Sequence, residues 1–192
     1  RRRNCNFMFA LRILAALAVL CFALAPQLAR AQIQLLASDP LLVAAFQGDA
    51  ATVRRVLMGG KSPNTADNDN RTALMWAVIA GRYEAASVIV EFKPRLDFAD
   101  SAGNTALYYA ADRGDAELVD LLVGAGASVN LPNQQGQTPL MAAARKGSMP
   151  VVQALLAAKA DHKRTDYTGK TALDWARDGR SPHITRALEA AR

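Results

Sequence analysis

The chain has 192 residues, of which 51% are apolar and 21% charged, and its formal net charge at pH 7 is +6. Such a composition is typical of a globular protein. The positive charge belongs to residues 1–31, which contain five arginines and no acid, so the remainder has a net charge of only +1 and gives little reason to expect nucleic-acid binding. Both cysteines, Cys5 and Cys21, also lie there, which excludes thiol catalysis and cysteine-bound metal from the rest of the chain.

Residues 1–31 have the pattern of a secretory signal peptide. Arginines come first, an apolar run extends from Ile13 to Ala25, and Ala29 and Ala31 form an A-x-A cleavage site. The run is shorter than the roughly 20 residues that a membrane-spanning helix needs. The sequence therefore predicts cleavage before Gln32, export to the periplasm of a bacterium or secretion from it, and membrane contact only if the leader is retained.

After a short lead-in at residues 32–38, one unit of 33 residues is repeated to the end of the chain. Three markers keep the same phase, which makes a chance alignment very improbable. The first is Thr-x-Leu, opened by Thr72, Thr105, Thr138 and Thr171. The second is a glycine nine residues after the threonine, or after Asp39 in the first repeat, at Gly48, Gly81, Gly114 and Gly147. The third is an Asp or Asn five residues before the threonine, at Asp67, Asp100, Asn133 and Asp166.

Each unit predicts the same local structure. The Asp-x-x-Gly segment is a turn, with Asn70 in the glycine position of its repeat because Asn tolerates positive φ. The threonine then caps a short helix, which Pro139 can open in its repeat, and the later glycine ends it. A second helix follows with apolar residues at helical spacing. The predicted repeats are 39–71, where Asp39-Pro40-Leu41 replaces the threonine motif, then 72–104, 105–137, 138–170 and 171–192.

This pattern resembles the ankyrin repeat, a β-turn followed by two antiparallel helices with a T-P-L-H-x-A core. The resemblance covers residues 39–192 and implies an all-α repeat solenoid of about five repeats. The family's histidine is missing, and its position holds Leu42, Met75, Tyr108, Met141 and Asp174. We therefore expect apolar packing to replace the hydrogen bonds that this histidine makes between neighbouring turns.

Other departures concern turns and ends. Lys93 and Lys159 stand where Gly60 and Gly126 close the second helix of other repeats, so these turns are expected to be strained or built differently. Polar residues replace apolar ones at Arg55 in the first repeat and at Thr185 and Glu189 in the last. A terminal repeat must present a polar face to water, so these residues predict caps at both ends.

The resemblance also implies a binding surface, since partners of ankyrin arrays usually contact the hairpin tips and the adjacent end of the first helix along a concave face. At the tips these positions are Asn68, Asp69, Arg71, Ser101, Asn104, Gln134, Gln135, Gln137, Tyr167 and Lys170. At the helix ends they are Ile79, Asp112, Arg113, Arg145 and Lys146. They vary between repeats while the framework does not. The surface is polar with charges of both signs, which favours a folded protein as partner, although ordinary solvated loops would give the same pattern.

Three further features bear on function. His162 and His183 lie on different elements without carboxylates at ligand spacing, and no phosphate-binding loop or hydrolase motif occurs, so we expect no metal, no cofactor and no catalytic residue. Trp76, Tyr109 and Trp175 share one position, which the resemblance places between neighbouring repeats, although an aromatic stripe of this kind could also bind a ligand. From Arg145 onward there are ten basic and five acidic residues, which fits either a solvated cap or a site for an acidic partner.

The sequence thus predicts an exported, non-enzymatic protein that binds another protein through its concave face and is a monomer by itself. Two alternatives are compatible with the same residues. One is a membrane-tethered scaffold with an uncleaved leader, and the other is an accessory or inhibitory subunit of an exported enzyme.

Overall fold

The fold was taken from a computed structural model, which describes residues 39–191. These residues form ten helices in five pairs. The first helices of the pairs are α2 (Pro40–Gln47), α4 (Ala73–Ile79), α6 (Ala106–Arg113), α8 (Pro139–Lys146) and α10 (Ala172–Asp178). The second helices are α3 (Ala50–Met58), α5 (Tyr83–Glu91), α7 (Ala116–Gly124), α9 (Met149–Ala157) and α11 (Pro182–Ala190).

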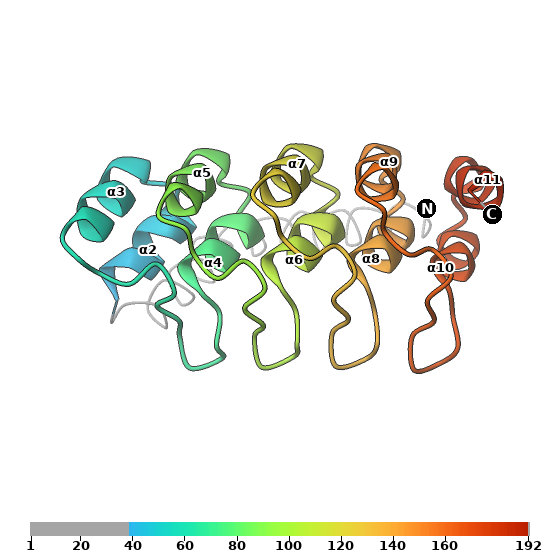
Figure 1. Ribbon diagram of the computed structural model, residues 1–192, viewed down its shortest axis with the longest axis horizontal. Helices are drawn as coiled ribbons and strands as arrows, with labels where there is room; N and C mark the ends of the chain where they lie inside the picture. The colour runs from blue at the N-terminus through green and yellow to red at the C-terminus, as the bar shows by residue number, and fades with distance from the viewer. Residues whose placement is uncertain (1–38, 192) are drawn as a thin grey trace, which may run out of the picture. The chain divides into compact units, whose positions relative to one another are not determined.

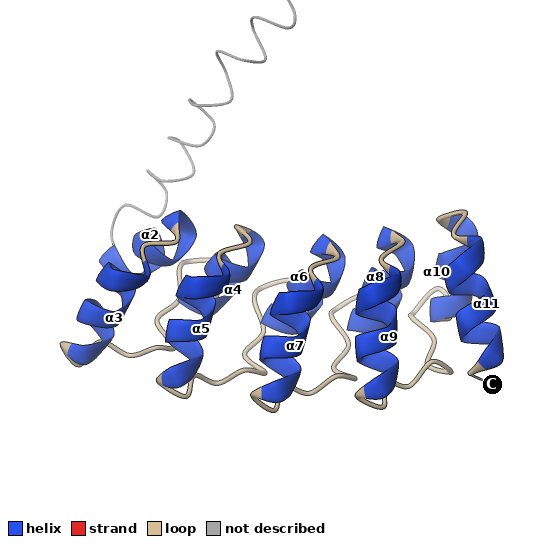
Figure 2. Ribbon diagram, turned by 90° about the horizontal axis from the view of Figure 1, so that it is seen from above, coloured by secondary structure: helices blue, strands red, loops and turns tan. Residues whose placement is uncertain are grey.

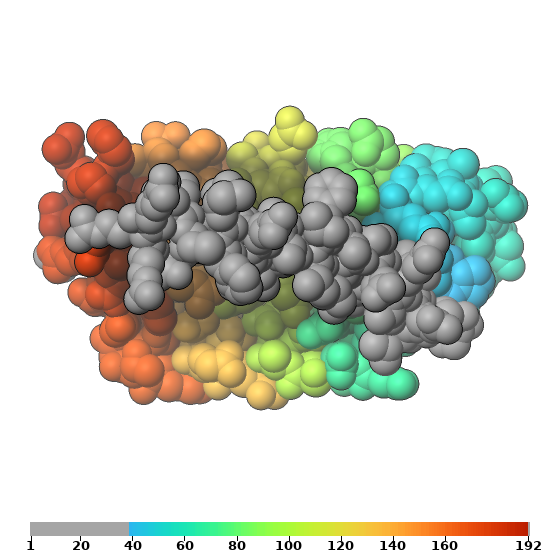
Figure 3. All heavy atoms as spheres, turned by 180° about the vertical axis from the view of Figure 1, so that it is seen from behind, coloured from blue at the N-terminus to red at the C-terminus, as the bar shows by residue number. Residues whose placement is uncertain are grey.

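The five helix pairs lie side by side in chain order and form two layers (Figures 1 and 2). The first helices make one layer and the second helices the other, and a hairpin loop extends beyond the first layer before each pair from α4 onward (Figure 1). In the view from behind, the hairpins form a continuous row along one edge (Figure 3). The predicted all-α repeat solenoid is therefore confirmed for the described residues.

The repeated threonine and glycine set the ends of the first helices. The side chains of Thr72, Thr105, Thr138 and Thr171 each accept a hydrogen bond from the backbone N–H three residues on, at 3.2–3.4 Å. This bond satisfies one of the donors that a helix start leaves free. Gly114 and Gly147 end α6 and α8 in the left-handed conformation, as predicted.

Four residues other than glycine adopt positive φ among those described. Asn70 has φ 60°, as its position in the hairpin predicts, and Lys93 and Lys159 have φ of 51° and 64°. The two lysine turns therefore keep the geometry of the glycine turns, at a cost of about 1–2 kcal/mol each. Arg180, with φ 52°, occupies the position of the glycines that follow the first helix in the four preceding repeats.

The core lies between the two helix layers and between neighbouring pairs. Paired alanines on the first helices let the layers approach closely, and Ala45, Ala77, Ala110, Ala111 and Ala143 are fully buried. Larger side chains such as Leu118, Leu140 and Leu155 are also fully buried. Burial of each such leucine contributes about 1.5–3 kcal/mol.

The end repeats present polar residues where the inner repeats are apolar. Arg55 and Glu189 are exposed, and Thr185 is partly exposed whereas Val119 and Val152 in the same position are fully buried. The predicted caps thus have the expected exposure. None of the helices within residues 39–191 is both long enough and apolar enough to cross a membrane. The predicted signal peptide (1–31), its cleavage residues and the lead-in (32–38) lie outside the described residues.

Candidate functional site

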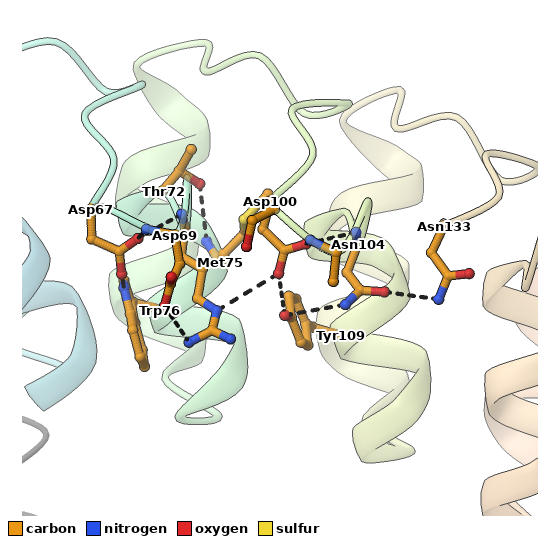
Figure 4. Close-up of polar contacts among 12 residues, drawn as sticks. Asp67, Asp69, Thr72, Met75, Trp76, Asp100, Asn104, Tyr109 and Asn133 are labelled. Carbon is orange, nitrogen blue, oxygen red and sulfur yellow. Dashed lines mark hydrogen bonds and ion pairs between the residues drawn. The ribbon is translucent and has the colours of Figure 1, made fainter. Parts of the chain in front are cut away.

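The hairpins are held by the Asp or Asn that opens each of them. One side-chain oxygen of Asp100 accepts hydrogen bonds from the backbone N–H groups of Ala102 and Asn104, at 2.9 and 2.8 Å (Figure 4). The equivalent oxygens of Asp67, Asn133 and Asp166 accept the same two bonds at 2.9–3.0 Å. A short polar side chain thereby fixes the path of each tip, which is the usual role of an Asx turn.

In three repeats the second oxygen of this carboxylate binds an aromatic side chain nine residues further on. Trp76 donates its indole N–H to Asp67 at 2.9 Å, and Tyr109 donates its hydroxyl to Asp100 (Figure 4). Trp175 donates to Asp166 at 3.0 Å. Trp76 is buried as predicted, whereas Tyr109 and Trp175 are only partly buried. All three side chains support the hairpins from the side of the first helix.

The hairpin at Asn133 differs in both members of this pair. Its aromatic position holds Ala142, which has no donor, and the acid is replaced by Asn133. The amide of Asn133 instead donates to the side-chain oxygen of Asn104 in the preceding repeat, at 3.0 Å (Figure 4). A carboxylate buried at position 133 would find no hydrogen-bond donor at position 142 on α8. The loss of the aromatic donor is therefore consistent with the replacement of the acid by Asn133.

Hydrogen bonds also join each hairpin to the next. Ser101 N donates to Asp69 O at 2.8 Å, and Gln134 N donates to Ala102 O at 3.1 Å. Tyr167 N donates to Gln135 O at 3.0 Å. The four hairpins therefore form a connected row, which predefines the spacing of the side chains that they carry.

The expectation that apolar packing replaces the missing histidine is only partly correct. Met75 and Met141 are indeed buried at that position. Tyr108, however, donates its hydroxyl to the side-chain oxygen of Gln137 in the next hairpin, at 2.8 Å. Burial raises the pKa of both Tyr108 and Tyr109, so these hydroxyls remain protonated donors at neutral pH. Polar contacts between repeats are thus retained without the histidine.

The predicted binding residues lie along the hairpins and the adjacent helix ends; we call this surface the hairpin face. Its most exposed large apolar side chain is Tyr167, at 77%. The other exposed members are Asn68, Asp69, Ser101, Arg113, Gln134, Gln135, Arg145 and Lys146. The partly buried members are Arg71, Ile79, Asn104, Asp112, Gln137 and Lys170.

Ion pairs between repeats bring several of these residues together. Arg145 contacts Asp112 of the preceding repeat at 2.7 Å and lies over the ring of Trp175 of the following one, 5.6 Å from its centre. Lys170 also lies over this ring, 4.8 Å from its centre, and contacts Asp178 at 2.7 Å. Two cations and one indole therefore form a cluster at the C-terminal part of the hairpin face.

A second cluster surrounds Arg71. Its guanidinium lies 3.7 Å from a carboxylate oxygen of Asp69 and 3.7 Å from one of Asp100. It also lies over the ring of Trp76, 5.4 Å from its centre. The structure does not bring the remaining predicted residues into either cluster; Arg113, for example, donates to the backbone oxygen of Ile79 at 2.8 Å.

The repeat pattern does not by itself identify the residues that hold the hairpin face in place. It indicates only turns at Asp100 and Asp166 and gives no role to Asp178. A signal is present in the sequence, because an aromatic residue with a hydrogen-bond donor follows each of the two turn acids by nine residues and Asp178 follows Lys170 by eight.

The carboxylate of Asp166 is held in its charged form. Burial would raise its pKa, but hydrogen bonds from Thr168, Lys170 and Trp175 outweigh this effect and lower the pKa. The carboxylate is therefore charged at neutral pH.

The described residues contain no group of three or more histidines, cysteines or acids that could hold a metal ion. His162 and His183 lie on a loop and on α11, respectively. The hairpin face thus offers hydrogen-bonding groups, charges of both signs and one exposed tyrosine. Such groups can recognise the surface of another molecule.

Comparison with known proteins gave one family. The model described as ankyrin repeats (3 copies) matches residues 41–133 and also residues 110–189, which together make up most of the chain. No curated protein matches the chain.

Proposed function

The chain belongs to the ankyrin-repeat family, whose members typically bind other proteins and are not enzymes, and we propose that it binds a folded protein through the hairpin face. The observation that carries this proposal is the fixed row of hairpins, which presents side chains that differ from one repeat to the next. The position after the Asp or Asn, for example, holds Asn68, Ser101, Gln134 and Tyr167.

Rigidity supports a role in binding. Each tip is fixed by two bonds to one side-chain oxygen and by a backbone bond to its neighbour, as described above. A surface that is ordered before binding loses little conformational entropy when a partner docks. The hairpin face is therefore suited to a partner that is itself folded.

The chemistry of the face supports a polar partner. The Arg145–Asp112 and Lys170–Asp178 pairs are each about half exposed, and such pairs contribute little to stability. Their charges can instead fix the orientation of a partner with complementary charges. Tyr167 supplies the kind of exposed aromatic side chain that is enriched at the energetic centres of protein interfaces.

Charge reversal on the hairpin face tests this proposal. The full chain with Arg113, Arg145 and Lys146 all changed to Glu should lose its partners in a pull-down from an extract of the exported proteins of the source cell, because three cations on one surface become anions. A variant with Arg54 and Arg55 changed to Glu, on α3 in the other helix layer, is the matched control. If the hairpin-face variant retains the same partners as the wild type, the proposed surface is wrong.

We also propose that the protein acts outside the cytoplasm, after removal of residues 1–31. The support is the order of arginines, apolar run and A-x-A site in the sequence. N-terminal sequencing of the protein recovered from the periplasm or medium should start at Gln32. Recovery of an uncleaved chain from the membrane fraction would favour the tethered scaffold instead.

A further inference from the structure

Each described hairpin except the last accepts a backbone hydrogen bond from the hairpin that follows it. The backbone oxygens of Asp69, Ala102 and Gln135 each accept a hydrogen bond from the next hairpin. Thr168 occupies the fourth such position, and no backbone donor for its backbone oxygen exists within residues 39–191. Gly169 beside it has no atom within 4 Å of an added Cβ, whereas an added Cβ on Gly103 would lie 2.7 Å from Gln134 N.

A second row of hydrogen bonds joins neighbouring repeats, in which a side-chain oxygen accepts a backbone N–H of the next repeat. At the same end of the array, the side chain in this position can no longer accept. The side chain of Asn64 accepts the backbone N–H of Arg95 at 2.7 Å, and Asp97 accepts that of Ser128 at 2.9 Å. Asn130 continues the row and accepts the N–H of Asp161 at 2.8 Å. The fourth position holds Lys163, which donates and cannot accept. Whatever lies beside Lys163 should therefore provide an acceptor, and a carboxylate suits a lysine best.

A cavity of about 400 Å³ lies at this end of the array. Its lining includes Lys163, His162, Thr171, Leu173 and Leu188. Thr171 is partly exposed, whereas Thr72, Thr105 and Thr138 in the same position are buried. The two leucines provide an apolar floor, so the cavity can accept an apolar side chain.

The occupant is not expected to be another helix pair. Thr185 and Glu189 make the outer helix of the last repeat polar, and Glu189 is already bound to Arg177 at 2.8 Å. A stacked helix would have to bury these groups against its own apolar side. The backbone oxygen of Thr168, by contrast, requires only a peptide N–H, as an extended segment provides.

The charge around this end favours an acidic occupant. All five acids among residues 145–191 are engaged in hydrogen bonds or ion pairs: Asp161 accepts the backbone N–H of Lys163 at 2.9 Å, and the others are Asp166, Asp174, Asp178 and Glu189. Within the part of the chain that the structure describes, no ion pair joins an acid to the cations Lys159, Lys163, Arg180 or Arg186. The basic excess noted in the sequence is therefore not neutralised by the fold.

We propose that Lys163, Thr168, Gly169, Thr171, Leu173 and Leu188 form an end site that binds an extended acidic segment of another protein. A backbone N–H of this segment pairs with the Thr168 oxygen, an apolar side chain enters the cavity, and an Asp or Glu pairs with Lys163. This site adjoins the hairpin face at the last described hairpin, where Thr168 and Gly169 lie between Tyr167 and Lys170, but it does not depend on the partner proposed there.

Selection from a random 12-residue peptide library displayed on phage tests the end site. The full chain is the bait, and enriched peptides should combine Asp or Glu with Leu, Ile, Val or Phe. In fluorescence anisotropy, labelled copies of these peptides should bind Lys163→Glu about tenfold more weakly than the wild type, because two like charges then face each other. Lys163→Arg keeps the charge and should bind within about twofold of the wild type.

Two controls distinguish binding at the end site from binding at the hairpin face. The variant with Arg113, Arg145 and Lys146 changed to Glu should keep its affinity for the peptides, although it loses the partner of the hairpin face. Peptide binding should shift the NMR signals of Thr168, Gly169 and Leu188. Enriched peptides without acids, equal binding by Lys163→Glu, or shifts confined to the hairpin face would each overturn the proposal. Concentration-dependent self-association that Lys163→Glu abolishes would do so too, because the occupant would then be a second copy of the chain.

Discussion

Replacement of Asp100 by Ala should lower the free energy of unfolding by about 3–5 kcal/mol, one of the two largest effects that we expect from a single substitution. The side chain is 5% exposed and accepts bonds from the N–H groups of Ala102 and Asn104 and from the hydroxyl of Tyr109. Alanine accepts none of them, so three donors lose their partner in a partly buried site. Urea unfolding followed by circular dichroism of the full chain measures the loss.

Asp100→Asn is the matched control for this prediction. Asn133 shows that an amide oxygen can accept the same two backbone bonds at 3.0 and 2.9 Å. The amide variant should therefore lose no more than about 1–1.5 kcal/mol. Equal losses in the two variants would mean that the side-chain bonds do not hold the hairpin.

Replacement of Gly103 by Ala should destabilise the array by about 3 kcal/mol. Two effects combine at this position. Gly103 has φ 79°, which costs an L-residue about 1–2 kcal/mol. In addition, the new Cβ would lie 2.7 Å from Gln134 N and 3.2 Å from two further backbone atoms of Asn133. The hairpins would have to separate, which would break the bond between Gln134 N and Ala102 O.

Gly169→Ala isolates the first of these effects. Gly169 has nearly the same φ, 82°, but no atom lies within 4 Å of its added Cβ. This variant should therefore lose only the conformational contribution, about 1–2 kcal/mol in the same urea experiment. If both alanine variants were equally destabilised, close contact between hairpins would have no part in the stability of the array.

The 33-residue period is enough to predict the fold, because each marker acts locally. Thr105 caps a helix through a backbone N–H three residues away, and Gly114 ends the same helix by its own backbone conformation. Such effects are fixed by neighbouring residues in the chain. The caps at Arg55 and Glu189 are predictable as well, since a polar residue in an apolar position of the repeat indicates a surface.

The hydrogen-bond partners that hold the candidate site in place are harder to predict from the sequence. The repeat pattern indicates only a turn at Asp100, yet its second oxygen binds Tyr109, and that pairing depends on how the hairpin folds back against the first helix. The same pattern suggests a loss of polar contact at Tyr108, but the spacing of adjacent repeats brings Gln137 within 2.8 Å of its hydroxyl. Local sequence patterns give no distances between repeats, so these hydrogen-bond partners could not be predicted from the sequence.

The sequence by itself therefore determined the repeat, its helices and its turns, because these follow from contacts within one unit. Only the tertiary structure decided which positions pair with one another, as Arg145 does with Asp112, and which have no partner among residues 39–191, as is the case for the backbone oxygen of Thr168. The physical reason is that hydrogen bonds and ion pairs require distances of about 3 Å, which are set by the stacking of whole repeats.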